Sequence, residues 1–277
     1  MAEPAADAGP VILTETRERI GIITLNRPGR RNALNGELIA ALDGAVRAMA
    51  ADPAAKVVIL TGAAAEGGHG GFCSGGDIKE RRGPDGSRPS DGSQLGVPPD
   101  ALSGDLSRHD THAAMLLHLM PKPTIAMIGG PAVGAGCSLA AACDLRFASQ
   151  DAVLAASFSP NGLSGDYGGS FFWTAILGTA RARELYLLND KIPAARALEL
   201  GMVHAVLPPD RLRDHTIEVA RRLTRTPAAL LALVKDNLNA AEDEVERRRH
   251  LFAREAENQV QSARLMGQRP QRAAQPG

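Results

Sequence analysis

The sequence contains few aromatic residues and few cysteines, and it carries no net charge. Of its 277 residues only 3% are Phe, Trp or Tyr, and 31 Lys and Arg balance 31 Asp and Glu. A neutral chain without a basic stripe or interleaved aromatic side chains gives no support for binding to nucleic acid or to an anionic membrane. No apolar run reaches the roughly 18 residues of a membrane span, and the N-terminus lacks a basic stretch followed by an apolar one.

The three cysteines, Cys73, Cys137 and Cys143, have no paired spacing of the kind that indicates a disulfide framework or a zinc site. We expect them to be small buried apolar residues in a reducing compartment, and we predict a cytoplasmic location and no metal. A hydrophobic content of 44% over this length is enough for one substantial core.

Strand-like and helix-like segments alternate along the chain, which predicts a layered α/β domain. Residues 11–28 indicate two strands broken at Glu18–Arg19, followed by a helix over 36–51 and a buried strand over 57–62. Further along the chain, a helix is expected over residues 180–188 after a glycine-rich turn.

The composition divides the chain into four regions. We expect a disordered leader over residues 1–10, a core domain over 11–205, a C-terminal helical region over 206–268 and a disordered tail over 269–277. Within the core, residues 80–105 are rich in Gly, Pro, Ser and Asp, and a segment of this length and polarity is typical of a mobile loop.

Two glycine-rich motifs carry the strongest functional signal, FCSGGDIKE at Phe72–Glu80 and IGGPAVGAGCSLAAACDLRFAS at Ile128–Ser149. Each is expected to lead from a strand through a tight turn into a helix, and such a turn leaves a backbone N–H group without a partner. Two N–H groups that converge on one oxygen form an oxyanion hole, which stabilises the charge that develops in an acyl-group reaction. The alternative is that the glycines only allow a helix to pack closely on a strand.

With these two motifs in this order, the chain resembles the crotonase superfamily, that is, the enoyl-CoA hydratase/isomerase family, from about Val11 to about Glu257. The resemblance implies an α/β fold with a crotonase-type spiral of ββα repeats as its core. It also implies C-terminal helices that assemble the chain into a homotrimer or a dimer of trimers. The implied substrate is an acyl-CoA, with coenzyme A as part of the substrate and no permanently bound cofactor. The implied oxyanion donors are the N–H groups of Gly76 and Ala135.

A second set of residues is implied to hold the coenzyme. The segment NRPGRRNAL, Asn26–Leu34, resembles the family's segment that meets the adenine and the phosphates, so Arg30 or Arg31 would pair with phosphate oxygens. Either arginine alone is explained equally well as part of a solvated basic turn. The remaining substrate and coenzyme contacts that the resemblance implies are Ala33, Ser74, Asp77, Ile78, Ser138 and Phe158.

The sequence departs from the family's hydratases at two positions. Those enzymes use two glutamates, and the matching residues here are Ser138 and Phe158. A hydratase needs one group to activate water and another to protonate the α-carbon, and two carboxylates supply both roles. Because a serine and a phenylalanine do not, we predict that double-bond isomerisation is favoured over hydration, with hydration as the main alternative.

Asp166, in the turn GLSGDYGG at residues 162–169, matches the acidic residue that some isomerases of the family carry. One carboxylate is enough for isomerisation, because the same group removes a proton from one carbon and returns it to another. We therefore predict that Asp166 is the proton shuttle. A turn or N-cap role before a helix that starts near Ser170 is the structural alternative.

Three other interpretations compete with this one. The segment that contains Asp166 also resembles dihydroxynaphthoyl-CoA synthases, but those lyases carry an aspartate where this chain has Ser164. A protein that kept the acyl-CoA pocket and lost its acids would bind acyl-CoA without catalysis. The third interpretation is a catalytic role for His109 or His112. Both fall in or just after the polar loop, where a solvated histidine is commoner than a catalytic one.

Overall fold

A computed structural model of the chain describes residues 9–65, 71–77 and 113–242. The predicted loop over 80–105 and the predicted tail lie outside the described residues, as does the predicted leader apart from Gly9 and Pro10. The C-terminal helical region is described as far as Glu242.

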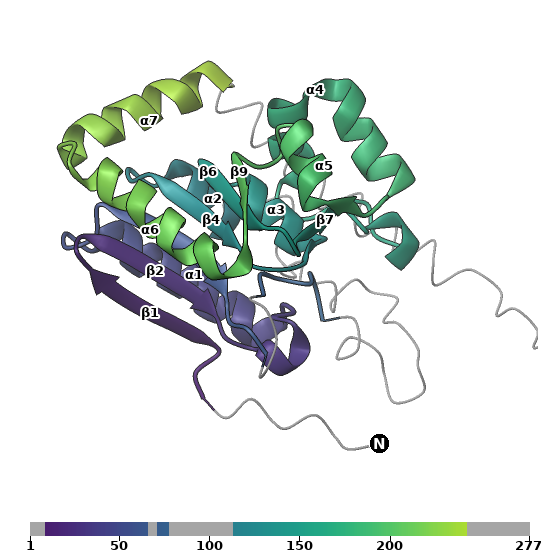
Figure 1. Cartoon of the computed structure of the whole chain (residues 1–277), viewed down its shortest axis with the longest axis horizontal. Helices are drawn as coiled ribbons and strands as arrows, with labels where there is room; N and C mark the ends of the chain where they lie inside the picture. Colours follow the sequence, from purple (N-terminus) through teal and green to yellow (C-terminus); the bar gives the residue numbers. More distant parts are fainter. Residues whose placement is uncertain (1–8, 66–70, 78–112, 243–277) are drawn as a thin grey trace, which may run out of the picture.

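A six-stranded sheet forms the main layer of the molecule (Figure 1), in the order β1-β2-β3-β4-β6-β9. Only the β1–β2 pair is antiparallel, and the later strands run parallel to β2. Glu18 and Arg19 form the turn of that hairpin with φ of 52° and 66°, and two positive φ values give the backbone twist that a two-residue hairpin needs. The hairpin predicted from residues 11–28 is therefore confirmed. The strands are β1 (Ile12–Arg17), β2 (Ile20–Leu25), β3 (Val57–Gly62), β4 (Thr124–Ile128), β6 (Leu145–Ser149) and β9 (Ala205–Leu207).

A smaller sheet has the strand order β5-β7-β8, with β5 (Ala132–Val133), β7 (Val153–Ala155) and β8 (Ile192–Pro193). The chain alternates between the two sheets, because β4 of the large sheet is followed by β5 of the small one, and β6 is followed by β7. A helix follows each of these pairs. The repeating unit is thus strand, strand and helix, and the predicted layered α/β architecture is confirmed.

The helices are α1 (Gly36–Ala51), α2 (Ala113–Leu119), α3 (Ala135–Ala141), α4 (Gly169–Leu188), α5 (Ala194–Glu199), α6 (Pro209–Thr224) and α7 (Ala228–Glu242). The sequence predicted a helix over residues 180–188 and a helix start near Ser170, and both belong to α4. Gly178, with φ of 73° and ψ of 165°, breaks the helix into two parts, and the first part begins at Gly169. None of the described helices is long and apolar enough to cross a membrane.

Helices cover both faces of the main sheet. In α1, the side chain of Asn35 accepts a hydrogen bond from the Leu38 N–H and caps the helix, and apolar residues at helical spacing from Leu38 to Met49 are buried in the larger core. On the other face, Leu212 and Ala220 of α6 pack in a second core with side chains of β2, β3, β4 and β6. Most buried residues of the two glycine-rich motifs belong to the larger core, whereas Leu145 and Phe147 of the second motif pack in the second core.

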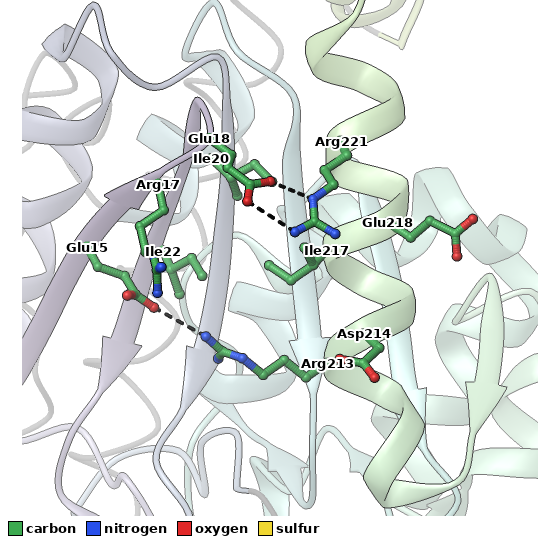
Figure 2. A pocket seen from close by; sticks show the side chains of 10 residues that line it. All are labelled: Glu15, Arg17, Glu18, Ile20, Ile22, Arg213, Asp214, Ile217, Glu218 and Arg221. Carbon is green, nitrogen blue, oxygen red and sulfur yellow. Dashed lines mark hydrogen bonds and ion pairs between the residues drawn. The ribbon is translucent and has the colours of Figure 1, made fainter.

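A groove of about 540 Å³ lies on the α6 side, between α6 and the β1–β2 hairpin (Figure 2). Arg213 and Arg221 of α6 reach toward the hairpin, where they pair with Glu15 at 3.3 Å and with Glu18 at 2.6 Å. These four side chains are exposed, so the ion pairs contribute little stability. The floor of the groove contains Ile20 and Ile22, which belong to the second core rather than to the core of the glycine-rich motifs.

Helix α7 has an unusual distribution of polar residues. Its inward side carries Lys235, whose ammonium group donates to the carbonyls of Leu117 and Lys122 and pairs with Asp144 at 2.8 Å. The apolar residues point outward: Leu230, Leu233, Val234 and Leu238 are 48–62% exposed. Their spacing places them on one stripe of the helix, so α7 presents an apolar surface to its surroundings.

Candidate active site

The structure brings the two glycine-rich motifs together. The N–H of Cys73 donates to the Pro131 carbonyl at 3.1 Å, and the N–H of Val133 donates to the Cys73 carbonyl at 2.9 Å. The first motif therefore pairs in parallel with the stretch that leads into the second. Because the pairing ends just before Gly76 on one side and Ala135 on the other, both turns lie at the same end of this short ladder.

The segment predicted to meet the coenzyme lies along the other edge of the first motif. The N–H of Leu34 donates to the Gly75 carbonyl at 2.8 Å, the N–H of Asp77 donates to the Leu34 carbonyl at 2.9 Å, and the N–H of Ser74 donates to the Arg31 carbonyl at 3.1 Å. Three segments distant in sequence thus form one continuous surface around the turn at Gly75 and Gly76.

Glycine is required at several points of this contact. Gly75 has φ of +87° and Gly134 has φ of +55°, both in the left-handed region. A Cβ on Gly75 would lie 2.7 Å from the Val133 carbonyl oxygen and 3.6 Å from the Ala135 nitrogen. A Cβ on Gly136 would overlap the carbonyl of Cys73. The two turns are therefore as close as backbone segments can come.

The N–H groups of Gly76 and Ala135 stay available at this junction. Within the described part of the chain, neither donates to any backbone carbonyl outside regular helices and strands. Ala135 is also the first residue of α3, where a backbone N–H has no partner inside the helix. The two turns that contain Gly76 and Ala135 therefore adjoin, with the backbone nitrogen of Ala135 3.6 Å from the position that a Cβ on Gly75 would take.

A buried ion pair, which the sequence did not reveal, fixes the first turn. The guanidinium of Arg27 contacts the carboxylate of Asp77 at 3.1 Å, with only 11% and 7% of the two side chains exposed. The same guanidinium donates to the carbonyl of Ala33 at 2.6 Å. Asp77 was predicted to contact the substrate or coenzyme, but in the structure its carboxylate binds Arg27. The pair links the Arg27–Ala33 stretch to the residue directly after Gly76.

Asn32 completes this support. Its side-chain oxygen accepts from the Arg27 N–H at 2.9 Å, and its amide donates to the Ala63 carbonyl at 3.0 Å. Arg30 and Arg31, by contrast, have exposed side chains next to this rigid core. Ala33 is buried and Ser74 is partly exposed, whereas Ile78 lies outside the described residues.

The two positions that hold glutamates in hydratases are buried and lack a carboxylate. Ser138, on the first turn of α3, has no exposed surface, and its hydroxyl lies 3.4 Å from the Gly134 carbonyl. Phe158 is 4% exposed, and its ring lies 3.8 Å from the position that a Cβ on Gly134 would take. The ring of Phe158 therefore packs against the second glycine-rich turn, and neither position supplies a carboxylate.

Asp166 lies in a turn with several residues of positive φ. Gly165, Tyr167 and Gly168 have φ of 157°, 55° and 67°. Tyr167 is 4% exposed, and a buried non-glycine residue in the left-handed region carries a conformational cost that is typical of functional sites. The partly exposed Asp166 carboxylate accepts a hydrogen bond from the Tyr167 N–H at 2.8 Å.

The N-cap residue of α4 is Gly168, and the backbone carbonyl of Asp166 accepts a hydrogen bond from the Gly169 N–H at 3.2 Å. The turn lies next to the second motif, because a Cβ on Gly169 would overlap the hydroxyls of Ser138 and Tyr186. The start of α4 therefore packs on α3 one turn after Ala135, and Asp166 precedes that contact by three residues.

The three cysteines and His118 are buried in the core. All three cysteines are free and buried, as predicted, and burial raises the pKa of each thiol to about 12. His118 of α2 is buried and packs against Phe172 with ring centroids 5.1 Å apart. His109 and His112 lie outside the described residues.

The fold is built of strand, strand and helix repeats, and it brings the two glycine-rich turns together. The sequence matches the family profile described as enoyl-CoA hydratase/isomerase over residues 15–268. The chain belongs to the enoyl-CoA hydratase/isomerase family, and its fold is the crotonase fold.

Three relatives illustrate the range of names in the family. The chain is 34% identical over 232 residues to the 1,2-epoxyphenylacetyl-CoA isomerase of Escherichia coli K12, an alignment that covers 83% of this chain and 82% of the relative. It is 36% identical over 223 residues to a probable enoyl-CoA hydratase of Rhizobium meliloti, covering 80% and 79%. The crystal structure of an enoyl-CoA hydratase from Mycobacterium avium subsp. paratuberculosis superimposes with a TM-score of 0.75, at 29% identity and coverage of 96% and 99%.

Proposed function

We propose that the protein isomerises the double bond of an enoyl-CoA thioester, with Asp166 as the proton shuttle and the N–H groups of Gly76 and Ala135 as the oxyanion hole. The observation that carries the proposal is the chemistry of three positions: Ser138 and Phe158 supply no carboxylate, and Asp166 supplies one from the neighbouring turn. The E. coli relative is named a 1,2-epoxyphenylacetyl-CoA isomerase, so relatives of this chain include isomerases as well as hydratases.

The steps need only one acid–base group. The Asp166 carboxylate removes a proton from C2 of a 3-enoyl thioester, and the electron pair forms the C1–C2 double bond of a dienolate while charge collects on the thioester oxygen. The N–H groups of Gly76 and Ala135 stabilise that oxygen. The electrons then form the C2–C3 double bond and restore the thioester carbonyl, while C4 takes the proton back from Asp166. No water is consumed.

The coenzyme is proposed to lie along the Asn26–Leu34 segment. Arg30 and Arg31 are exposed beside the rigid Arg27–Asp77 support, so their guanidinium groups are placed to pair with phosphate oxygens without a large desolvation cost. Ala33, Ser74 and Ile78 are proposed to line the path from the coenzyme to the thioester.

Hydration is the second candidate reaction, because the Rhizobium relative is named a probable enoyl-CoA hydratase. A lyase like the dihydroxynaphthoyl-CoA synthases is less well supported, since the residue at the position of their aspartate is the exposed Ser164. The experiment that separates isomerisation from hydration compares two substrates. The enzyme is offered a 3-enoyl-CoA, with formation of the conjugated 2-enoyl-CoA followed by absorbance, and a 2-enoyl-CoA, with loss of that absorbance.

The Asp166→Asn variant is included in both assays. We expect isomerisation to fall by about 10²–10⁴-fold, the usual effect of removing a general acid–base group, while acyl-CoA binding measured by calorimetry changes little. Rapid hydration that is unaffected by Asp166→Asn would reject both the reaction and the residue.

We also propose that the chain forms a homo-oligomer through the apolar stripe of α7, and that it acts in the cytoplasm. The stripe contains Leu233 and Leu238, which are 62% and 61% exposed, and a second copy of the chain is the partner that the family resemblance implies. Substituting both residues with Glu is expected to convert the assembly to monomers in analytical ultracentrifugation, with Arg213→Glu on α6 as a surface control. An unchanged mass of the double variant would exclude this stripe as the interface.

A further inference from the structure

Aromatic residues are rare in this chain, and most of them fall between residues 158 and 186. The sequence has six Phe, two Tyr and one Trp. Six of these fall in the short stretch that contains Asp166, namely Phe158, Tyr167, Phe171, Phe172, Trp173 and Tyr186. All but Tyr186 are buried, and Tyr186 is partly exposed.

Phe158 and Tyr186 form a stacked pair within this group. Their ring centroids are 5.8 Å apart and the ring planes are inclined by 17°. Phe158 also lies against the second oxyanion turn at Gly134. The pair therefore forms an aromatic wall directly beside the place where the thioester carbonyl would bind.

Tyr186 fixes the orientation of that wall. It comes from the second part of α4, after the break at Gly178. Its hydroxyl is buried and points back to Gly169 and Ser138, because a Cβ on Gly169 would overlap both hydroxyl groups. One end of the ring is thus held by the backbone of α4 and the other by α3, while the face of the ring supports Phe158.

A wall of fixed aromatic rings discriminates among acyl groups by shape. A planar ring stacks on aromatic side chains, and it has few rotors whose freedom is lost on binding. A straight acyl chain gains less from the flat surface and loses more conformational freedom. One additional aromatic contact changes the affinity by about two- to tenfold.

From this geometry we infer that the acyl pocket selects a planar, ring-bearing acyl group, and that Tyr186 is a specificity-determining residue that positions Phe158 for this role. The inference rests on the proposed acyl-CoA isomerase function and names the substrate class of the same site. Tyr186 touches Phe158 rather than the reacting atoms, so its effect is expected in the preference between acyl groups.

The test measures by calorimetry the binding of two thioesters that cannot isomerise, phenylacetyl-CoA and hexanoyl-CoA. We expect the wild-type protein to bind phenylacetyl-CoA about two- to tenfold more tightly. Tyr186→Leu and Phe158→Leu should each bring the ratio close to one, whereas Tyr186→Phe, which keeps the stacked ring, should preserve it. Thermal unfolding of each variant shows whether the chain remains folded, and Phe158→Leu provides the test if Tyr186→Leu does not fold.

Failure of the inference is distinguishable from failure of the proposed function. Equal affinity of the wild-type protein for both thioesters, or an equal loss of both affinities in Tyr186→Leu, would overturn the ring selection and leave isomerisation unaffected. Turnover of ring-bearing and linear 3-enoyl-CoA substrates gives a second readout, in which kcat/KM should favour the ring-bearing one. Absence of turnover with both substrates would reject the proposed reaction, while the binding ratio would still decide the specificity.

Discussion

The Arg27–Asp77 pair provides a direct test of how the oxyanion turn is held in place. The perturbation is Asp77→Asn, which keeps the shape of the side chain and removes its charge. In the wild-type protein both side chains are nearly buried, and the guanidinium contacts the Asp77 carboxylate at 3.1 Å and the Ala33 carbonyl at 2.6 Å. The variant would therefore replace the anionic partner of a buried cation with a neutral one.

The expected loss of stability follows from this burial. Breaking a buried ion pair by removing one partner usually costs about 3–5 kcal/mol, because the other charge is left uncompensated. The remaining bond to Ala33 and the amide oxygen of the substituted side chain keep the effect at the lower end, so we expect about 3 kcal/mol. Because the substituted residue follows Gly76 directly, kcat/KM should fall as well.

Denaturant unfolding measures the change in the free energy of unfolding, from the midpoint and slope of the transition in the wild-type protein and in the variant. The matched control is the double variant Arg27→Met/Asp77→Leu, which removes both charges and should recover part of the stability. Arg213→Met is a second control, since its ion pair with Glu15 is exposed and should contribute less than about 1 kcal/mol. A loss below about 0.5 kcal/mol in Asp77→Asn would refute the claim that this pair anchors the turn.

Two further predictions concern other parts of the fold. Gly136→Ala should reduce isomerase activity and lower the melting temperature, because a Cβ would overlap the Cys73 carbonyl and separate the two glycine-rich turns. The control is Gly44→Ala on the open surface of α1, which should be neutral or stabilising. Equal behaviour of the two variants would contradict the close contact. Burial raises the pKa of Asp43, which accepts a hydrogen bond from the Ala113 N–H, to about 6. Since this pKa lies above that of the unfolded chain, the native state favours the protonated carboxyl group of Asp43. The stability that this protonation contributes to the native state is present below about pH 4 and is lost as the pH rises through about 6. The free energy of unfolding of Asp43→Asn, relative to that of the wild-type protein, should therefore rise by about 1–2 kcal/mol between those pH values, a figure reduced for solvent screening. Denaturant titrations at several pH values measure this difference, and a difference that does not change with pH would exclude the coupling.

Local sequence patterns were sufficient for much of the fold. The hairpin turn at Glu18–Arg19, the helix at 36–51 and the strand at 57–62 all occur where the sequence predicted them. Each depends on interactions between residues that are close in the chain, such as the alternation of apolar side chains and the N-cap at Asn35. The start of α4 was expected near Ser170, but its extent up to residue 180 was left open because the glycine-rich start and the glycine at 178 resemble a loop in local composition.

The supporting residues of the site could not be predicted in this way. Arg27 and Asp77 are separated by 50 positions, and nothing in the local composition distinguishes this arginine from Arg30 and Arg31. Tyr186 resembles an ordinary residue of an amphipathic helix until the contact with Phe158 is known. Gly76, Ala135 and Asp166 were predicted because their motifs identify the family, and their roles in catalysis are still proposals.

Incubation of the enzyme with a 3-enoyl-CoA and, separately, with a 2-enoyl-CoA in water labelled with heavy oxygen decides between isomerisation and hydration. We expect the 3-enoyl-CoA to give the conjugated 2-enoyl-CoA with no labelled oxygen in its mass spectrum, at a rate that falls by about 10²–10⁴-fold in Asp166→Asn. An unchanged 3-enoyl-CoA, together with rapid formation of labelled 3-hydroxyacyl-CoA from the 2-enoyl-CoA, would contradict the proposed reaction, because hydration would require a group that activates water beside Ser138 and Phe158.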